Sequence, residues 1–331
     1  MKSYKLVPTL LSLVCVLITA PFLRSQEKET PASVQVHVVI TNEAVGVDND
    51  IPVLLSGDVK VQQGKNVLKV QQLIPAQGEN AALQLFVLID DTLDPGIGNN
   101  LNEIRDFINA QPASTMIAVG YMANASVNVV QNFTADHGLT TNALRIPRGS
   151  LSTMDSPYLS LISLVKGWPQ QNVRREVLMV TDGIDRLRGG QITPSRLGPN
   201  YGAVNHSMPS MSPDVNSASE ISQRYNVLVY SLYAVGVGRG LRSSWDRQIG
   251  LSGLTKITDE TGGDCFSLGT SSLVSFKPYL ERLQKLFANQ YYVVFQAAPK
   301  GKAGLQRIKV TTEVPRAEIA QPNNVWVPEG K

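Results

Sequence analysis

Two apolar runs, each ending in acidic residues, constrain the fold of this chain more than any other feature. The first covers residues 82–94, ALQLFVLIDDTLD, and the second covers residues 177–185, VLMVTDGID. Neither run alternates polar with apolar residues, which is typical of strands buried on both faces of a parallel sheet. In such sheets ligands bind beyond the carboxyl ends of the central strands. We therefore expect the polar residues that end the two runs to lie together at one edge of a sheet.

Strand and helix patterns alternate after the first run. Apolar residues recur at helical spacing over 97–110, and a second helix is predicted over 157–166, where Ser156 precedes Pro157. Alternation of this kind is the signature of a parallel sheet with helical crossovers. The sequence therefore predicts a doubly wound, mostly parallel α/β domain over residues 80–288.

Both flanks of this domain have the pattern of β-strands. Residues 34–41 alternate between apolar and polar side chains, apart from Val39, and a hairpin is predicted around Gln63-Gly64-Lys65. The tail, 289–328, is predicted to form a β-hairpin around Pro299-Lys300-Gly301. We expect this tail to pack with the N-terminal segment, 34–75, into one small β domain.

The first 25 residues have the pattern of a signal peptide, with Lys2 and Lys5 before an apolar stretch. We expect cleavage near Ser25 or Gln26, and a mature protein without a membrane span that is periplasmic or extracellular. Of the 30 Lys and Arg residues, Lys2, Lys5 and Arg24 lie in this segment, which contains no acid, so the rest of the chain balances its 27 acidic residues. A neutral mature chain gives no reason to expect nucleic acid as a partner.

The motifs resemble those of the von Willebrand factor type A (VWA) domain, in particular secreted bacterial proteins in which this domain has flanking β segments. The resemblance rests on DDTLD at 90–94, VLMVTDG at 177–183, ISQRYNVLVYSLYAVGVG at 221–238 and LTKITDETGGDCF at 254–266, and it covers residues 34–328. It implies a doubly wound α/β fold that mediates protein–protein interaction or adhesion. It also implies a metal-ion-dependent adhesion site (MIDAS), written Asp-x-Ser-x-Ser, with a Thr and an Asp from two further loops.

Carried onto this sequence, the resemblance assigns five metal ligands. Asp90 matches the first Asp of the motif, Thr92 the first Ser, and Asp182 the last Asp, whereas Asp94 stands where the second Ser should be. Ser156 is placed at the Thr position, with Thr153 as the second choice. Carboxylate and hydroxyl oxygens on separate loops suit Mg²⁺, and the additional carboxylate of Asp94 favours Ca²⁺. A bound dication could in turn capture a carboxylate of a protein partner.

Other interpretations of the same residues remain open. Ser156 and Asp94 could cap the helices that follow them. Asp91 and Asp185 could simply solvate a loop or cap a helix, without contacting a metal. The alternative function is a metal-free structural or assembly scaffold of the cell envelope, and the third is a hydrolase. The order Asp90-x-Thr92-x-Asp94 does not fit a phosphatase that needs an acid two residues after its aspartyl nucleophile. We therefore expect a protein that is not an enzyme.

Overall fold

The computed structural model describes residues 33–44, 51–169, 171, 173–187, 211–236, 244–271, 273–299 and 301–329. The predicted signal peptide, residues 1–25, lies outside the described residues, as does much of the loop after Asp182. The strands are β1 Val34–Ala44, β2 Val59–Gln63, β3 Asn66–Leu68, β4 Val70–Pro75, β5 Leu83–Asp90, β6 Thr115–Ala123, β7 Ser126–Thr134, β8 Arg174–Thr181, β9 Val227–Tyr233, β10 Cys265–Phe266, β11 Gln290–Ala297, β12 Gly304–Thr312, β13 Ala317–Ala320 and β14 Asn324–Val327. The helices are α1 Leu101–Asn109, α2 His137–Asn142, α3 Pro157–Gly167, α4 Pro213–Arg224, α5 Ser244–Thr261 and α6 Lys277–Ala288.

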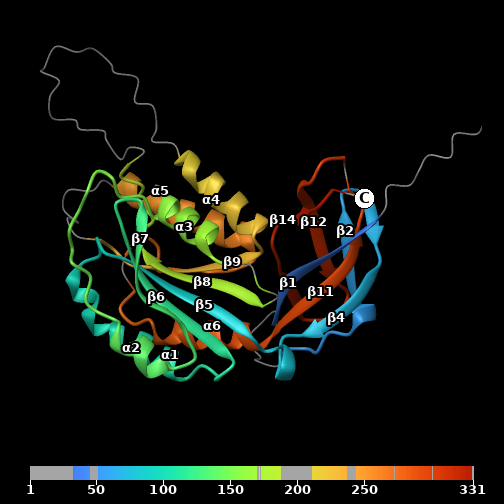
Figure 1. Cartoon of the computed structure of the whole chain (residues 1–331), viewed down its shortest axis with the longest axis horizontal. Coiled ribbons are helices and arrows are strands. Elements are labelled where there is room, and N and C mark those ends of the chain that lie inside the picture. The colour runs from blue at the N-terminus through green and yellow to red at the C-terminus, as the bar shows by residue number, and fades with distance from the viewer. Residues whose placement is uncertain are drawn as a thin grey trace, which may run out of the picture. The chain divides into compact units, whose positions relative to one another are not determined.

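The central sheet contains both apolar runs as neighbouring strands. Its six strands follow the order β10-β9-β8-β5-β6-β7, and every pair is parallel except β6 with the edge strand β7 (Figure 1). Every residue of β5 and β8 is buried, as the absence of polar alternation predicts. The predicted doubly wound, mostly parallel α/β fold is confirmed.

Helices cover both faces of this sheet, and each face has its own apolar core. Helices α1 and α6 lie on one face, and α3, α4 and α5 lie on the other (Figure 1). Apolar side chains of each group pack against the sheet. The residues of β5 alternate between the two cores, with Leu85 and Val87 on one side and Phe86 and Leu88 on the other. Because helices cover both faces, a ligand can reach the sheet only at the ends of its strands, where polar groups lie.

Two four-stranded antiparallel sheets form the small β domain. Their orders are β13-β1-β11-β4 and β14-β12-β2-β3, and their apolar faces share one core that includes Val38, Val61, Val293 and Val310. The predicted hairpin of β2 and β3 is present, with Gly64 at a φ of +64°. The N-terminal and C-terminal flanks therefore contribute strands to the same sheets, as predicted.

The predicted C-terminal hairpin is wrong. Strand β11 pairs with β1 and β4, whereas β12 pairs with β2 and β14, so the connection between β11 and β12 crosses from one sheet to the other. Consecutive strands with turn residues between them fit a hairpin and a crossover between sheets equally well. The outcome here depends on β1 and β2, which come from the other end of the chain and pair with the two tail strands.

A buried arginine joins the two parts of the structure at the amino end of β8. Arg174 is 4 % exposed and donates to the carbonyl oxygens of Phe287 and Ala81 and to Oε1 of Gln290, at 2.6–2.9 Å. The amide of Gln290 donates in turn to the hydroxyls of Thr41 and Tyr230. In the described part of the chain, no helix is long and apolar enough to cross a bilayer.

Candidate functional site

The two central strands bring Asp90 and Asp182 to the same edge of the sheet. β5 and β8 are adjacent and run in parallel, and β5 is followed by a helix on one face whereas β8 is followed by a helix on the other. This is the topological switch point of the sheet, where open α/β folds bind their ligands. Gly183, at a φ of +68°, turns the chain after Asp182, and a side chain there would meet the backbone of Gly250.

Asp90 and Asp182 are both buried carboxylates with fixed orientations. Oδ1 of Asp90 accepts from the backbone N–H of Thr92 at 2.9 Å, and its Oδ2 accepts from the hydroxyl of Thr181 at 2.7 Å. Oδ1 of Asp182 accepts from the backbone N–H of Ile184 at 3.0 Å. Burial, and then the negative charge of Asp182, raise the pKa of Asp90. A positive charge in this place would reduce the repulsion between the two carboxylates.

One cation of the chain already lies there. The guanidinium of Arg186 pairs with Oδ2 of Asp182 at 3.0 Å, its side chain is 12 % exposed, and its charge also lowers the pKa of Asp90, against the two larger effects. Sequence reasoning missed this residue. The sequence does place an arginine four residues after Asp182. That spacing predicts an ion pair on a helix, but not on a loop.

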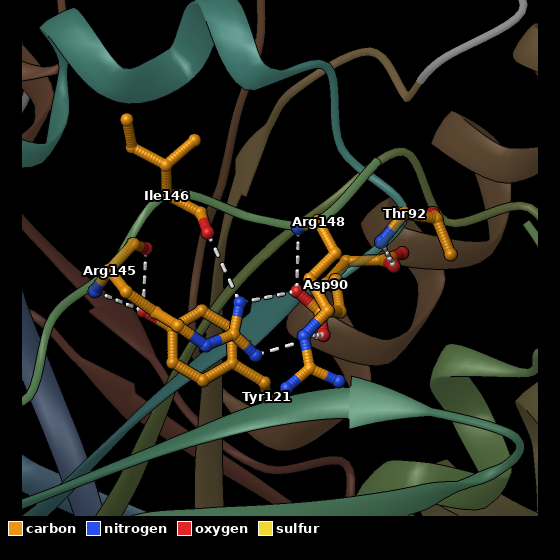
Figure 2. A network of polar contacts seen from close by, with 7 residues as sticks. Asp90, Thr92, Tyr121, Arg145, Ile146 and Arg148 are labelled. Carbon is orange, nitrogen blue, oxygen red and sulfur yellow. Dashed lines mark hydrogen bonds and ion pairs between the residues drawn. The ribbon is translucent and has the colours of Figure 1, made fainter. Parts of the chain in front are cut away.

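The hydroxyl of Thr92 is a predicted ligand atom that is buried without a hydrogen-bond partner within the described residues. Thr92 is 1 % exposed and its Oγ1 is buried, while its backbone N–H is bound to Asp90 (Figure 2). A buried hydroxyl without a partner costs about 1–3 kcal/mol. A ligand at this position would remove that cost.

Asp94 and Ser156 both act as helix caps. Oδ1 of Asp94 accepts from the backbone N–H of Gly96 at 2.8 Å, at the start of a short 3₁₀ helix, Pro95–Asn99, that delays the start of α1 to Leu101. Oγ of Ser156 accepts from the backbone N–H of Leu159 at 3.3 Å, and Ser156 is buried. Thr153, the second choice, is exposed. A capping oxygen keeps a free lone pair, so ligation by Asp94 and Ser156 stays a prediction.

Asp91 holds the neighbouring loop to the sheet. Both of its oxygens accept from the guanidinium of Arg145, at 2.7 and 2.9 Å, and Oδ1 also accepts from the backbone N–H of Arg148 at 2.9 Å. Figure 2 shows Arg145 lying over the ring of Tyr121, at 3.8 Å from its centroid. The hydroxyl of Tyr121 donates to the carbonyl of Arg145 and accepts from its N–H. Asp91 thus orders the loop that borders the site.

Replacing Asp91 by asparagine is expected to lower the free energy of unfolding by about 1–3 kcal/mol at pH 7. Burial opposes the ionisation of Asp91, but the hydrogen bonds from Arg145 and Arg148 outweigh it and lower the pKa below 3.8. Stability from this pair is therefore present above that pH and lost as the pH falls through the lowered pKa. Urea unfolding at neutral and acidic pH, with exposed Asp106→Asn as control, checks it. A cost that does not shrink in acid would contradict this assignment.

Exposed apolar side chains border the same edge of the sheet. Ile146, Leu151 and Met154 are 53, 46 and 52 % exposed, on a segment whose Gly149 N–H donates to the carbonyl of Asp91. Further exposed apolar residues lie at the start of α5 and after β10. We call the whole set the carboxyl-edge rim: Ile146, Leu151, Met154, Trp245, Leu268 and Val274.

The donor set at this edge fits a hard dication in part. No group of three or more His, Cys, Asp or Glu side chains that could hold a metal is found in the part of the chain that the structure describes. The site contains the buried carboxylates of Asp90 and Asp182 and the buried hydroxyl of Thr92, which has no partner among the described residues. It also contains the hydroxyl of Ser156, which caps α3. These are oxygen ligands of the kind that Mg²⁺ and Ca²⁺ take, and Arg186 is their competitor for Asp182.

Comparison with known proteins gives similarities of fold. No family model and no characterised sequence matches this chain. Similar solved structures include an aerotolerance-related membrane protein from Bacteroides fragilis (9 % identity, 62 % of this chain and 98 % of that chain, TM-score 0.40). They also include a von Willebrand factor type A protein from Catenulispora acidiphila (9 % identity, 91 % of this chain and 75 % of that chain, TM-score 0.38). The fold assignment itself rests on the strand order and helix layers of this chain.

Proposed function

We propose that this chain is an exported protein-interaction module that is not an enzyme, and that its contact surface is the carboxyl-edge rim. The observation that supports it is the gathering of exposed apolar side chains around a buried acidic pair. Scattered exposed apolar residues need no explanation, but several at one edge are typical of interaction sites. Here three of them, Ile146, Leu151 and Met154, follow one another on a single segment tied to Asp91.

We further propose that a divalent cation binds at the centre of this rim. Asp90, Thr92 and Asp182 would hold it, with the hydroxyl of Ser156 and the carboxylate of Asp94 as the remaining ligands. The cation would supply a positive charge able to attract a carboxylate of the partner. The hydroxyl of Thr92 supports this proposal, because a buried hydroxyl without a hydrogen-bond partner is unfavourable. A bound cation would accept its oxygen as a ligand and remove that cost.

Replacing Thr92 by valine tests the cation directly. Calorimetric titration of the chelator-stripped mature protein with Mg²⁺, Ca²⁺ and Mn²⁺ is expected to show saturable binding, weakened about tenfold or more in Thr92→Val. Valine keeps the shape of threonine and removes only the hydroxyl that lacks a partner. The cation-free variant is therefore expected to be as stable as the parent, or more stable by about 1 kcal/mol.

Ser222→Ala is the matched control, because Oγ of Ser222 on α4 is also buried without a partner but lies away from the site. Its stability should change in the same direction as that of Thr92→Val, with cation binding unaltered. Absence of binding by all three ions to the folded parent protein would remove the cation from the proposal and leave the interaction surface to be tested alone.

The surface itself is tested by photo-crosslinking in the producing cell. A photoreactive amino acid at Met154 is expected to capture a protein partner, whereas the same residue at Val67, on β3 of the small β domain, is not. Both positions are exposed, at 52 and 66 %. Equal capture at the two positions, or capture only at Val67, would contradict an interaction through the rim.

A metal-free scaffold is the second candidate, and the ion pair of Arg186 with Asp182 favours it. That pair gives the acidic centre a cation from within the chain. Under this alternative, partner capture at Met154 would be insensitive to chelators, which separates the two candidates.

A further inference from the structure

A cavity lies at the amino end of β8, which is the opposite end of the strands from the carboxyl-edge rim. Its volume is about 510 Å³, and its walls come from β1 and β14 of the small β domain and from β8 and the end of α4. The residues that matter for the argument are Gln35, His37, Arg175, Arg224, Tyr225 and Trp326. Small-molecule sites in proteins have volumes of roughly 300–1,000 Å³, so a small ligand fits.

Arg175 is the unusual member of this wall. It is 6 % exposed, and only its Nη2 has an acceptor, the backbone carbonyl of Tyr225. Its Nε and Nη1 are buried and have no hydrogen-bond partner among the residues that the structure describes. Burial lowers the pKa of the guanidinium, but an arginine does not give up its proton in a protein. A buried guanidinium that stays charged needs an anion nearby.

The described residues around this cavity supply no such anion. The lining contains no Asp or Glu, whereas it contains Arg175, Arg224 and His37. Partial desolvation at the cavity wall, and then the charge of Arg175, lower the pKa of His37, which favours the neutral imidazole, able to accept and donate one hydrogen bond each. Arg224 stacks over the ring of Trp326 at 4.3 Å from its centroid, which holds a second guanidinium at the cavity wall.

We propose that this cavity binds a small organic anion, with its oxyanion group bound by Arg175. The guanidinium would be neutralised by the ligand, and the amide of Gln35 and the imidazole of His37 would bind its other polar groups. A cation is excluded by the charge of the wall, and a purely apolar ligand would leave Nε and Nη1 of Arg175 without acceptors. The oxyanion is a carboxylate, sulfate or phosphate, each of which matches the planar guanidinium.

The test uses the full mature chain and three probes: citrate, sulfate and inorganic phosphate. Thermal unfolding and calorimetric titration are carried out at constant ionic strength, with the parent protein, Arg175→Met and Arg307→Met. Arg307 is an exposed arginine on β12 and serves as the control. At least one probe should bind the parent and Arg307→Met with the same dissociation constant, and bind Arg175→Met about tenfold more weakly or not at all. The class of probe that binds most tightly identifies the oxyanion.

General salt effects are separated by the same variants. Sulfate and phosphate raise the unfolding temperature of most proteins by exclusion from the surface, so an equal rise in the parent and in Arg175→Met counts against the site. No saturable binding of any probe to the parent also overturns the proposal. Should Arg175→Met fail to fold, Arg175→Lys keeps the charge but loses the planar fork, and unchanged affinity for every probe in that variant would overturn the role of the guanidinium.

Discussion

Replacing Arg186 by methionine is expected to lower the free energy of unfolding at pH 7.5 by about 3 kcal/mol. The substitution removes the guanidinium that faces both buried carboxylates, Asp90 and Asp182. Their repulsion is then screened less, and since burial and Asp182 already raise the pKa of Asp90, the cost should grow as the pH rises. Urea unfolding in the presence of a chelator measures this cost.

The same variant discriminates between the two proposed functions. Where a dication competes with Arg186 for Asp182, excess Mg²⁺ or Ca²⁺ should restore most of the lost stability of Arg186→Met, and should bind it more tightly than the parent protein. Where the arginine is a permanent structural cation, neither ion should restore stability. The first result supports the metal-dependent module and the second supports the scaffold.

Arg282→Met is the matched control for this experiment. Arg282 forms ion pairs with Glu43 and Asp264, but its side chain is 55 % exposed. Ion pairs at that exposure contribute about 0–1 kcal/mol. A cation response of Arg282→Met equal to that of Arg186→Met would show that the ions act through general screening.

Glu176→Gln is expected to produce a large change in the pH dependence of stability. Glu176 lies on β8 with a fully buried side chain, and its carboxylate oxygens accept no hydrogen bond at normal distance within the described residues. The amide of Gln290 donates to the hydroxyls of Thr41 and Tyr230. Burial raises the pKa of Glu176 from 4.5 to about 7, although the charge of Arg174 and the nearby amide of Gln290 both oppose this.

The sign of the effect follows from proton binding. Between pH 4.5 and about 7, the folded protein keeps the proton on Glu176 that the unfolded chain has released. Stability therefore falls as the pH rises through this range, by about 3 kcal/mol in total, and is flat above it. Glutamine cannot titrate, so Glu176→Gln should lack this loss.

Urea unfolding of both proteins from pH 4.5 to pH 8.5 measures the difference. The stability of Glu176→Gln relative to the parent should rise by about 3 kcal/mol across this range. Glu79→Gln, at an exposed position, is the control and should run parallel to the parent. A constant difference between Glu176→Gln and the parent would show that Glu176 titrates alike in the folded and unfolded chains.

Much of the fold could be predicted from local patterns. The unbroken apolar runs in β5 and β8 are buried on both faces, and the alternation in β1 places Val36, Val38 and Ile40 in the core of the small β domain. These patterns are reliable because burial on one face or two faces of a strand selects side chains residue by residue. β6 and β7 are joined by a turn at Asn124 and Ala125, which both adopt positive φ, a conformation that asparagine tolerates better than most residues.

The sequence by itself determined which residues end the central strands, and therefore that Asp90, Thr92 and Asp182 meet at one edge. Only the tertiary structure decided how their charges are balanced. Arg186 reaches Asp182 from a loop, and Arg145 holds Asp91 across 54 residues of chain. Arg175, at the other edge, has no acidic partner among the residues that the structure describes. Only the tertiary structure likewise decided that β11 and β12 pair with strands from the opposite end of the chain. Periodicity reports the environment of one residue at a time, whereas ion pairs, cavities and strand partners depend on which distant segments share a surface.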